Sequence, residues 1–468
     1  MGQGALNYQG IKSGIKLNDV IEEFKYVYKG QQIKAGDFVN YINGVAGETT
    51  ETTIETHTTT AQQIHASAGY TMVAVTLKED VAFLAYGTGD AIYGTICTLD
   101  KQNVVCSTVV TISSSARPQS GDGIVLTKIT EEKVMVSYTY DSSDNYRDYA
   151  LCSVSGNAIS VLSADNRLIS NNVTFSVDLL TEGKIIVVYV TGGYLVGKIG
   201  TVGDISVSFG VVTNLISSSV TLTDYGYSVV ALPDNKFLSL GRPDNSTLNG
   251  VVCSVSGATM TVEISDSSVI SSKYLCTRSL LYLSDNKVLC LHSTSSSAGH
   301  KACILKIGTS TISAGTIYGI GGTYAGVSTM YTSYLASDKA LVAYGGNGGN
   351  YARILSISGT TITPEIQYSS NTEGVYFSIT VLSEDKALFV FGDYSSTSSY
   401  KAYVHLLGIS DTTLSTTVNV SVTTTNTEYE TQVTLATEPP FDGIALSSGV
   451  GGDDTVHNQQ VKIAKPNV

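Results

Sequence analysis

Short alternations of apolar and polar residues, separated by turns rich in Asp, Asn and Gly, dominate the middle of the chain. The ten-residue phrase LSDNKVLCLH at residues 283–292 is typical, because it joins an Asp-Asn turn to a strand that is apolar almost throughout. Counterparts of this phrase begin at Leu77, Ile129, Leu180, Leu232, Leu335 and Leu382. Each one, together with the alternating run before it, predicts a β-hairpin.

The phrases recur at a nearly constant spacing. Aligned on the residue that ends the turn, they fall on Val81, Lys133, Lys184, Lys236, Lys287, Lys339 and Lys386. The successive spacings are 52, 51, 52, 51, 52 and 47 residues. A period of this length and regularity indicates a repeat architecture.

A second phrase recurs inside the period. The segment VVCSVSGATMTVE at residues 251–263 has counterparts at residues 150–162, 303–315 and 353–365. Each is an alternating run, a Ser-Gly or Gly-Thr turn and another alternating run, which predicts a second hairpin. Every period therefore holds four short strands, and the second strand, as in KALVAY, is apolar enough to be covered on both faces.

Four-stranded sheets stacked face to face around an axis provide that cover. The sequence thus predicts an all-β fold with a seven-bladed β-propeller of four-stranded blades over residues 61–420. We expect Leu289, Leu341 and Leu388 to lie in the cores between blades. An open β-solenoid or several β-sandwiches are the alternatives, but sandwich strands do not repeat at this spacing and β-helix periods are much shorter.

The two ends of the chain lie outside the repeats, and neither carries enough apolar residues to fold alone. We therefore expect residues 1–60 and 421–468 to form one small β docking domain, with Phe38 and Ile444 in a common core. The Thr-rich runs at the inner ends of these segments would be adjacent connecting strands that close the ring.

The segment AGDFVNYING (residues 35–44), followed much later by DGIALSSGVGGDDTVHNQQVKI (residues 442–463), resembles a glycine-rich pattern of small β-domains in bacteriophage structural proteins. Such domains occur in capsid-cement proteins and in tail or fibre proteins. In those families the two halves are usually close in sequence, whereas here the propeller separates them. The resemblance implies a virion protein that is made in the host cytoplasm, is present in several copies per particle, and binds other virion proteins of the tail, baseplate or capsid.

Charge and cysteine content narrow the choice of partners. The net charge is −13 without any Lys/Arg cluster, which argues against nucleic acid and anionic membranes as partners. No run of 18 apolar residues occurs, so we expect no membrane insertion. The seven cysteines lack CxxC spacing, and we interpret them as small buried apolar residues in a reducing compartment.

Catalytic motifs are missing from the sequence. The six histidines form no HExxH or HxH motif, and there is no GxSxG elbow, P-loop or EF-hand spacing. We therefore expect that the chain is not an enzyme and has no catalytic residues, metal or cofactor. A carboxylate pair contributed by different blades would nevertheless be invisible in the sequence.

The loops between the second and third strands vary from blade to blade, whereas the hairpin turns are short and nearly constant. In a propeller these variable loops share one face, which is where a repeat protein carries recognition, unless they are merely soluble loops. Side chains there that can stack on sugars or form adaptable hydrogen bonds are Tyr146, Arg147, Arg242, Asn245, Asn347, Tyr394 and Tyr400.

These observations favour a phage virion protein whose propeller binds host-surface polysaccharide or protein. A capsid decoration protein is the first alternative, and a cytoplasmic propeller enzyme is the second.

Overall fold

The structure of the 468-residue chain is a computed structural model. It describes residues 20–27, 32–33, 38–65, 71–88, 91–100, 103–116, 123–139, 146–170, 175–216, 227–242, 247–271, 274–293, 299–321, 330–346, 349–370, 377–393, 401–435, 443–445, 449–450 and 460–466. The chain divides into two compact units, one of Met1–Glu55 with Val420–Val468 and one of Thr56–Asn419. Among the described residues, no helix has the length and hydropathy needed to cross a membrane.

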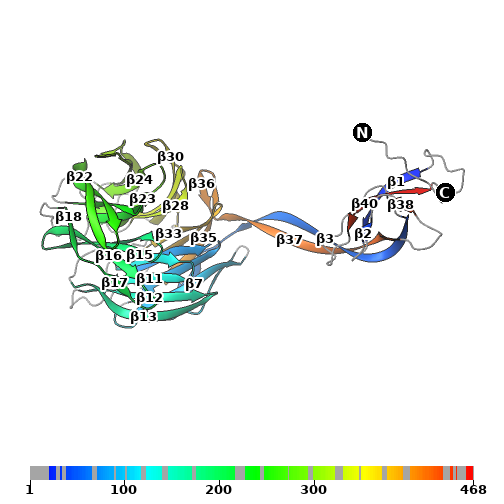
Figure 1. Ribbon diagram of the computed structural model, residues 1–468, viewed down its shortest axis with the longest axis horizontal. Coiled ribbons are helices and arrows are strands. Elements are labelled where there is room, and N and C mark those ends of the chain that lie inside the picture. The colour runs from blue at the N-terminus through cyan, green and yellow to red at the C-terminus, as the bar shows by residue number, and fades with distance from the viewer. Residues whose placement is uncertain are drawn as a thin grey trace. The chain divides into compact units, whose positions relative to one another are not determined.

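The larger unit contains seven antiparallel sheets, which we number as blades in chain order (Figure 1). Blade 1 consists of β5 (Thr71–Lys78), β6 (Val81–Gly87), β7 (Ile92–Asp100), β8 (Asn103–Cys106) and β9 (Val110–Ser113). Blade 2 consists of β10 (Ile124–Thr130), β11 (Lys133–Thr139), β12 (Arg147–Ser155) and β13 (Ala158–Ile169). Blade 3 consists of β14 (Phe175–Thr181), β15 (Lys184–Thr191), β16 (Tyr194–Val202), β17 (Val207–Phe209) and β18 (Thr213–Ile216).

The remaining four blades repeat this plan. Blade 4 consists of β19 (Tyr227–Leu232), β20 (Lys236–Gly241), β21 (Leu248–Ser256) and β22 (Thr259–Ile270). Blade 5 consists of β23 (Tyr274–Tyr282), β24 (Lys287–Ser293), β25 (His300–Ile307), β26 (Ile312–Ala314) and β27 (Tyr318–Gly321). Blade 6 consists of β28 (Met330–Ala336), β29 (Lys339–Gly346), β30 (Gly349–Ser358), β31 (Thr361–Pro364) and β32 (Tyr368–Ser369). Blade 7 consists of β33 (Phe377–Ser383), β34 (Lys386–Asp393), β35 (Lys401–Ser410), β36 (Thr413–Ser415) and β4 (Gln62–His65).

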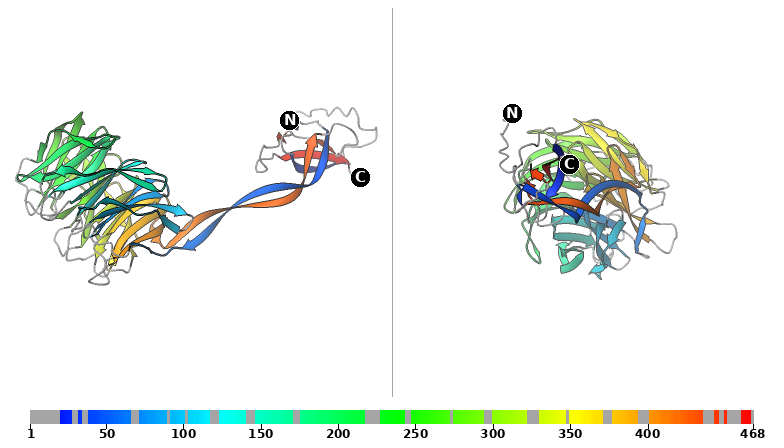
Figure 2. Two further views of the ribbon diagram at one scale, coloured as in Figure 1. Left: turned by 90° about the horizontal axis from the view of Figure 1, so that it is seen from below. Right: turned by 90° about the vertical axis from the view of Figure 1, so that its right-hand side faces the viewer.

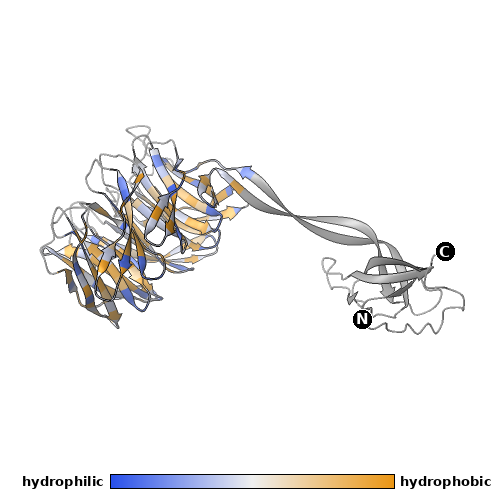
Figure 3. Cartoon of the chain, turned by 90° about the horizontal axis from the view of Figure 1, so that it is seen from above, coloured by the Kyte–Doolittle hydropathy of each residue, from blue (hydrophilic) through white to orange (hydrophobic). Residues whose placement is uncertain are grey.

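The blades form a ring, because the first strand of each blade packs against the first strand of the next and β33 packs against β5 (Figure 2). Buried apolar residues of neighbouring blades form common clusters. Figure 3 shows apolar residues in orange along the strands of the blades. Leu289, Leu341 and Leu388 are all fully buried, as expected. The predicted all-β, seven-bladed propeller is therefore confirmed.

One backbone hydrogen bond occurs in all seven blades. A third-strand N–H donates to the carbonyl of the turn between the first two strands, at 2.7 to 2.9 Å, in the pairs Leu99–Asp80, Val154–Glu132, Val202–Gly183, Val255–Asn235, Ile307–Asn286, Ile357–Asp338 and Ile409–Asp385. Several of these turn residues have positive φ, as at Asp80 (58°) and Asn286 (57°). Asp, Asn and Gly adopt that conformation at least strain, which explains the turn composition of the repeated phrase.

In some blades the lysine of the repeated phrase contacts the following blade. Lys133 Nζ donates to Gly203 O at 3.2 Å, and Lys184 Nζ donates to Gly257 O at 3.3 Å. In both pairs the acceptor lies in the turn between the third and fourth strands of the following blade.

The outer strand of a blade differs from the expectation of a single strand. In blades 1, 3, 5 and 6 it is broken into two short strands that both pair with the third strand. In blades 2 and 4 it is continuous, but it contains a residue with positive φ, Asp165 (53°) or Ser268 (76°). A break or a bulge lets the outermost strand follow the twist of the sheet and keeps its free edge short or irregular.

Blade 7 closes the ring with strands from both sides of the propeller sequence. Its outer strand is again in two parts, with β36 from the C-terminal side and β4 from the N-terminal side. Strand β4 pairs antiparallel with β35, in a register that places Gln62 opposite Val404. The Thr59 hydroxyl, just before β4, donates to Leu406 O at 2.7 Å.

The smaller unit is a closed barrel of β1 (Val20–Val27), β37 (Thr417–Leu435), β3 (Phe38–Thr58), β38 (Gly443–Ala445) and β40 (Gln460–Pro466). A separate pair joins β2 (Gln32–Ile33) to β39 (Gly449–Val450). Phe38 and Ile444 are register partners, although their side chains lie outside what the structure describes. The prediction that the two ends of the chain build one small β structure is confirmed.

Candidate ligand-binding site at the loop face

The loops between second and third strands share one end of the blades with the connections between blades, because the chain direction alternates in each antiparallel sheet. We call this end the loop face. Three of the candidate residues that the sequence indicates lie there within the described residues, namely Tyr146, Arg147 and Arg242. The other four lie outside the described residues, namely Asn245, Asn347, Tyr394 and Tyr400.

The two candidate arginines are buried. Arg147 is 8% exposed; its Nη1 donates to Thr139 Oγ1, and its guanidinium lies 5.9 Å from the centroid of the Phe175 ring. Arg242 is 4% exposed. This burial leaves little of either guanidinium for a macromolecular ligand, so packing inside the propeller explains much of their presence.

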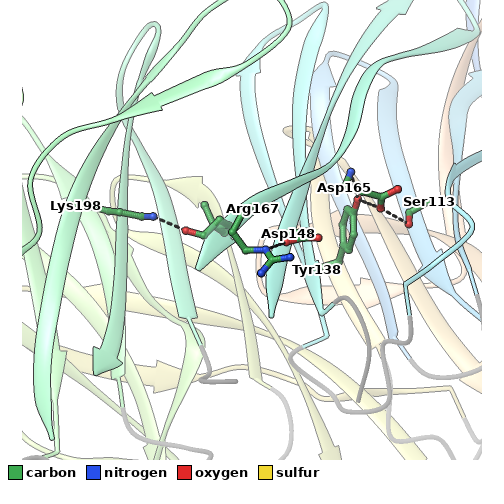
Figure 4. A network of polar contacts seen from close by, with 7 residues as sticks. Ser113, Tyr138, Asp148, Asp165, Arg167 and Lys198 are labelled. Carbon is green, nitrogen blue, oxygen red and sulfur yellow. Dashed lines mark hydrogen bonds and ion pairs between the residues drawn. The ribbon is translucent and has the colours of Figure 1, made fainter. Parts of the chain in front are cut away.

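Tyr146 contacts an arginine that sequence reasoning missed. The guanidinium carbon of Arg167, near the end of β13, lies 3.4 Å from the centroid of the Tyr146 ring. Arg167 Nε donates to Asp148 Oδ1 at 2.8 Å (Figure 4). The Arg167 side chain is 44% exposed, whereas that of Asp148 is 2% exposed. A buried carboxylate therefore orients the Arg167 guanidinium, while the Arg167 side chain remains partly exposed to solvent.

A bulge in the outer strand places Arg167 opposite Asp148. The register between β12 and β13 shifts next to Asp165, after which Asp148 and Arg167 are direct partners. Asp165 Oδ1 accepts hydrogen bonds from Ser113 Oγ at 2.7 Å and from Tyr138 OH at 2.9 Å (Figure 4). Since the Asp165 N–H also donates to Tyr138 OH, the bulge is fixed on both sides. No sequence signal revealed this shift, because the repeated phrases do not cover it.

Burial and the ion pair act in opposite directions on the pKa of Asp148. Burial raises the pKa of the Asp148 carboxyl above its ordinary value, while the Arg167 guanidinium opposes that shift. Within the described residues Arg167 contacts Asp148 through Nε, and 44% of its side chain is exposed, so part of the guanidinium is accessible to a ligand. Such a fork suits carboxylate, sulfate or phosphate oxygens, as well as sugar hydroxyls.

Lys198 of β16 ties the same region to blade 3. Its Nζ donates to Leu168 O and lies 4.0 Å from the centroid of the Phe209 ring (Figure 4). Lys198 is 9% exposed, and burial lowers its pKa to about 8. The backbone beside Arg167 is therefore held from the neighbouring blade as well.

The site contains no assembled metal centre, since no three His, Cys, Asp or Glu side chains come together as potential ligands among the described residues. What the arrangement offers is one oriented, partly exposed guanidinium on an aromatic ring, on the face that also carries the variable loops.

No protein-family model matches the chain, and no curated protein matches it. Solved structures with a similar fold include a putative 6-phosphogluconolactonase from Bacteroides uniformis, with a TM-score of 0.53, 9% identity, and coverage of 75% of this chain and 100% of that one. A periplasmic gluconolactonase from Pseudomonas aeruginosa has a TM-score of 0.48 and 10% identity, with coverage of 75% of this chain and 97% of that one. A saccharide-bound ulvan lyase has a TM-score of 0.43 and 8% identity, with coverage of 83% of this chain and 97% of that one. At these identities the likeness shows the β-propeller fold alone.

The comparisons bear on two expectations. The resemblance of the terminal segments to bacteriophage proteins receives no support from a family or curated match and stays a prediction. The expectation that the chain is not an enzyme is wrong as an exclusion, because a propeller of similar fold is named as a putative 6-phosphogluconolactonase. That expectation depended on missing linear motifs, and a propeller can assemble its reacting groups from several blades.

Proposed function

We propose that the chain is a bacteriophage virion protein that docks through its terminal barrel and binds host-surface polysaccharide at the loop face of its propeller. The observation that carries the binding role is the Arg167 guanidinium, which is oriented by Asp148, stacked on Tyr146 and 44% exposed. Acidic bacterial polysaccharides present carboxylate or phosphate groups beside sugar rings, which matches a guanidinium beside an aromatic ring.

The docking role is supported by the barrel and by the resemblance of its glycine-rich segments to phage structural domains. Both ends of the chain are built into the barrel, which gives it strands separate from those of the propeller. Such a division suits a protein that anchors with one unit and presents the other in several copies, where multivalency raises weak affinities. Capsid decoration remains the alternative position on the particle.

Binding is tested with the purified full-length chain on an array of uronate-bearing, phosphate-bearing and neutral bacterial polysaccharides. We expect anionic glycans to bind and Arg167→Met to weaken that binding about tenfold or more, since a hydrogen bond to a charged group contributes about 1.5–3 kcal/mol. Tyr146→Ala should weaken binding about fivefold, from a stacking contact of about 1 kcal/mol. Product analysis on the same array would reveal any turnover of a bound glycan.

The matched controls lie at the opposite end of the blades. Tyr334→Ala removes a tyrosine that is 47% exposed near the turn after β28, and Lys236→Met removes an exposed cation paired with Glu263. Both should leave binding unchanged. Equal losses in all four variants, or no binding to any anionic glycan, would refute the binding role. Immunogold labelling of phage particles separates the two positions: label on the tail supports adhesion, label on the capsid supports decoration, and unlabelled particles refute the virion proposal.

A further inference from the structure

Two cysteines face each other on the outer edge of blade 1. Cys97 on β7 and Cys106 on β8 are register partners in an antiparallel pair. Their Sγ atoms lie 3.0 Å apart. Cys97 is 2% exposed, whereas Cys106 is half-buried on the short outer strand. Directly opposed residues in antiparallel strands have Cα separations of about 4.5–5.5 Å, which a disulfide can span.

We propose that Cys97 and Cys106 form a disulfide by exchange with a low-molecular-weight disulfide such as oxidised glutathione. Cys106 attacks first as the thiolate, forms a mixed disulfide and releases one small thiol. The Cys97 sulfur then attacks the Cys106 sulfur and releases the second small thiol. In total, two protein thiols are oxidised to one disulfide and one small disulfide is reduced to two thiols, and the two protein protons end on the small thiols.

The surroundings of the two thiols support this order of attack. Cys106 is the more exposed residue of the two, and its hydrogen bond with Cys97 lowers its pKa, although burial opposes that shift. The same hydrogen bond and burial raise the pKa of Cys97. The accessible residue is therefore the one that ionises first, as a thiol that reacts with small disulfides must.

The position of the pair gives the disulfide a structural consequence. Strand β8 packs against β35 of blade 7, and β35 is the strand that pairs with β4 to close the ring. Blades 1 and 7 are neighbours because β5 packs against β33. We call the boundary between them the seam of the ring, since the first and last blades meet there and β4 completes blade 7. A bond between β7 and β8 would hold the outer strand of blade 1 in place on blade 7.

A second cysteine pair provides a matched control. Cys290 and Cys303 are also register partners, on β24 and β25 of blade 5, but both are fully buried. Small disulfides reach neither sulfur while the propeller is folded, so this pair should stay reduced under the same treatment.

The test is performed on the reduced full-length chain, incubated with oxidised glutathione, alkylated under denaturing conditions and mapped by peptide mass spectrometry. We expect loss of two of the seven thiols, recovery of a Cys97–Cys106 linked peptide, and alkylated Cys290 and Cys303. Cys290→Ser should leave this result unchanged, and Cys106→Ser should abolish it.

Thermal unfolding supplies a second readout that does not depend on the variants' folding yield. Oxidised wild-type protein should unfold at a higher temperature than the same protein with dithiothreitol, and Cys106→Ser protein should show no such difference. Unreacted Cys97 and Cys106, a stable glutathione adduct on Cys106 with Cys97 free, or equal oxidation of the Cys290–Cys303 pair would each overturn the proposal.

Discussion

Lys198 is a single buried cation whose charge has a measurable energetic effect. Burial lowers its pKa from 10.5 to about 8, so the folded chain binds this proton less tightly than the unfolded chain does. Between these two values the unfolded state carries more of the proton, and stability therefore rises with pH. Below pH 8 the folded chain carries the full free-energy cost of burying the charged Lys198 ammonium group, and the pKa shift corresponds to roughly 3 kcal/mol.

Lys198→Met removes this penalty together with the hydrogen bond to Leu168 O. We therefore expect the difference in free energy of unfolding, variant minus wild type, to be most favourable to the variant at pH 7 and to decrease towards pH 10. Urea denaturation at pH 7, 9 and 10 measures it. Lys236→Met, which removes an exposed lysine, is the control and should give a nearly constant difference, and the same flat profile for Lys198→Met would contradict the argument.

Leu341 tests how tightly the core is packed. It is fully buried in a cluster that spans several blades. Leu341→Ala should lower the free energy of unfolding by about 2–5 kcal/mol, because a methyl-lined cavity replaces the lost side chain. Ile366→Ala, at a position that is 64% exposed, should change it by less than about 0.5 kcal/mol. Chemical denaturation of both variants checks the contrast.

At this scale the sequence predicted burial better than binding. Leu289 and Leu341 follow from the period, since the same position recurs in every apolar second strand. Arg167 could not be found in this way, because its place opposite Asp148 depends on a bulge that displaces the local register. Arg147 has the chemistry of a ligand-binding residue, but it is buried against Phe175.

The repeated hairpin is the element that the sequence describes most completely. The residue of its turn that accepts the backbone hydrogen bond from the third strand is Asp, Asn or Gly in six of the seven blades and Glu132 in blade 2. In three blades the lysine reaches the following blade, as Lys133 reaches Gly203. Lys236 instead pairs with Glu263 of its own blade. The division of the outer strand was not predictable, since nothing in its alternating pattern distinguishes a broken strand from a bulged one.

A buried histidine, His405, lies at the seam of the ring and contacts the segment just before β4. His405 Nδ1 lies 2.9 Å from Tyr368 OH, and its Nε2 lies 3.4 Å from Thr59 O, which suits a ring that accepts from Tyr368 and donates to Thr59. Burial lowers the pKa of His405 below its usual 6.5. The unfolded chain therefore takes up this proton first, and stability falls as the pH drops below 6.5.

We expect hydrogen-exchange protection of residues 59–65, corrected for intrinsic exchange rates, to fall between pH 7 and pH 5. In His405→Gln protein the protection should depend less on pH, because the glutamine amide can still donate to Thr59 O and does not titrate in this range. His300, whose pKa burial also lowers, lies in blade 5, and His300→Gln should leave the pH response of residues 59–65 intact. Identical responses in both variants would contradict a local role for His405.

The molecule consists of two compact units. The barrel is built from the N- and C-terminal segments, whereas the propeller is built from the residues between them. The barrel alternates strands from both ends, since β38 and β40 from the C-terminal segment pair with β3 and β1 from the N-terminal segment. The propeller unit extends from Thr56 to Asn419 and so includes only the residues next to β4 and β36 from these segments. The fold class followed from the repeat, whereas the order of strands in the barrel needed the structure.

Removing residues 443–468 should therefore abolish the barrel and leave the propeller folded. We expect the full-length chain to show two unfolding transitions by calorimetry and the truncated chain to retain the propeller transition at nearly the same temperature. Loss of both transitions on truncation would show that the propeller cannot fold without the barrel.

The strand β4 has a consequence for how the protein is made. Its partner β35 lies more than three hundred residues further along the chain, so β4 emerges from the ribosome long before it can pair. Strand β1 likewise waits for β40, which lies more than four hundred residues further along the chain. Each unit is therefore completed only after its late strand has been made, and pairing over such sequence separations is slow. A ribosome that stops early would release a propeller with an open seam and unpaired strand edges, a substrate for chaperones and proteases rather than a partly functional product.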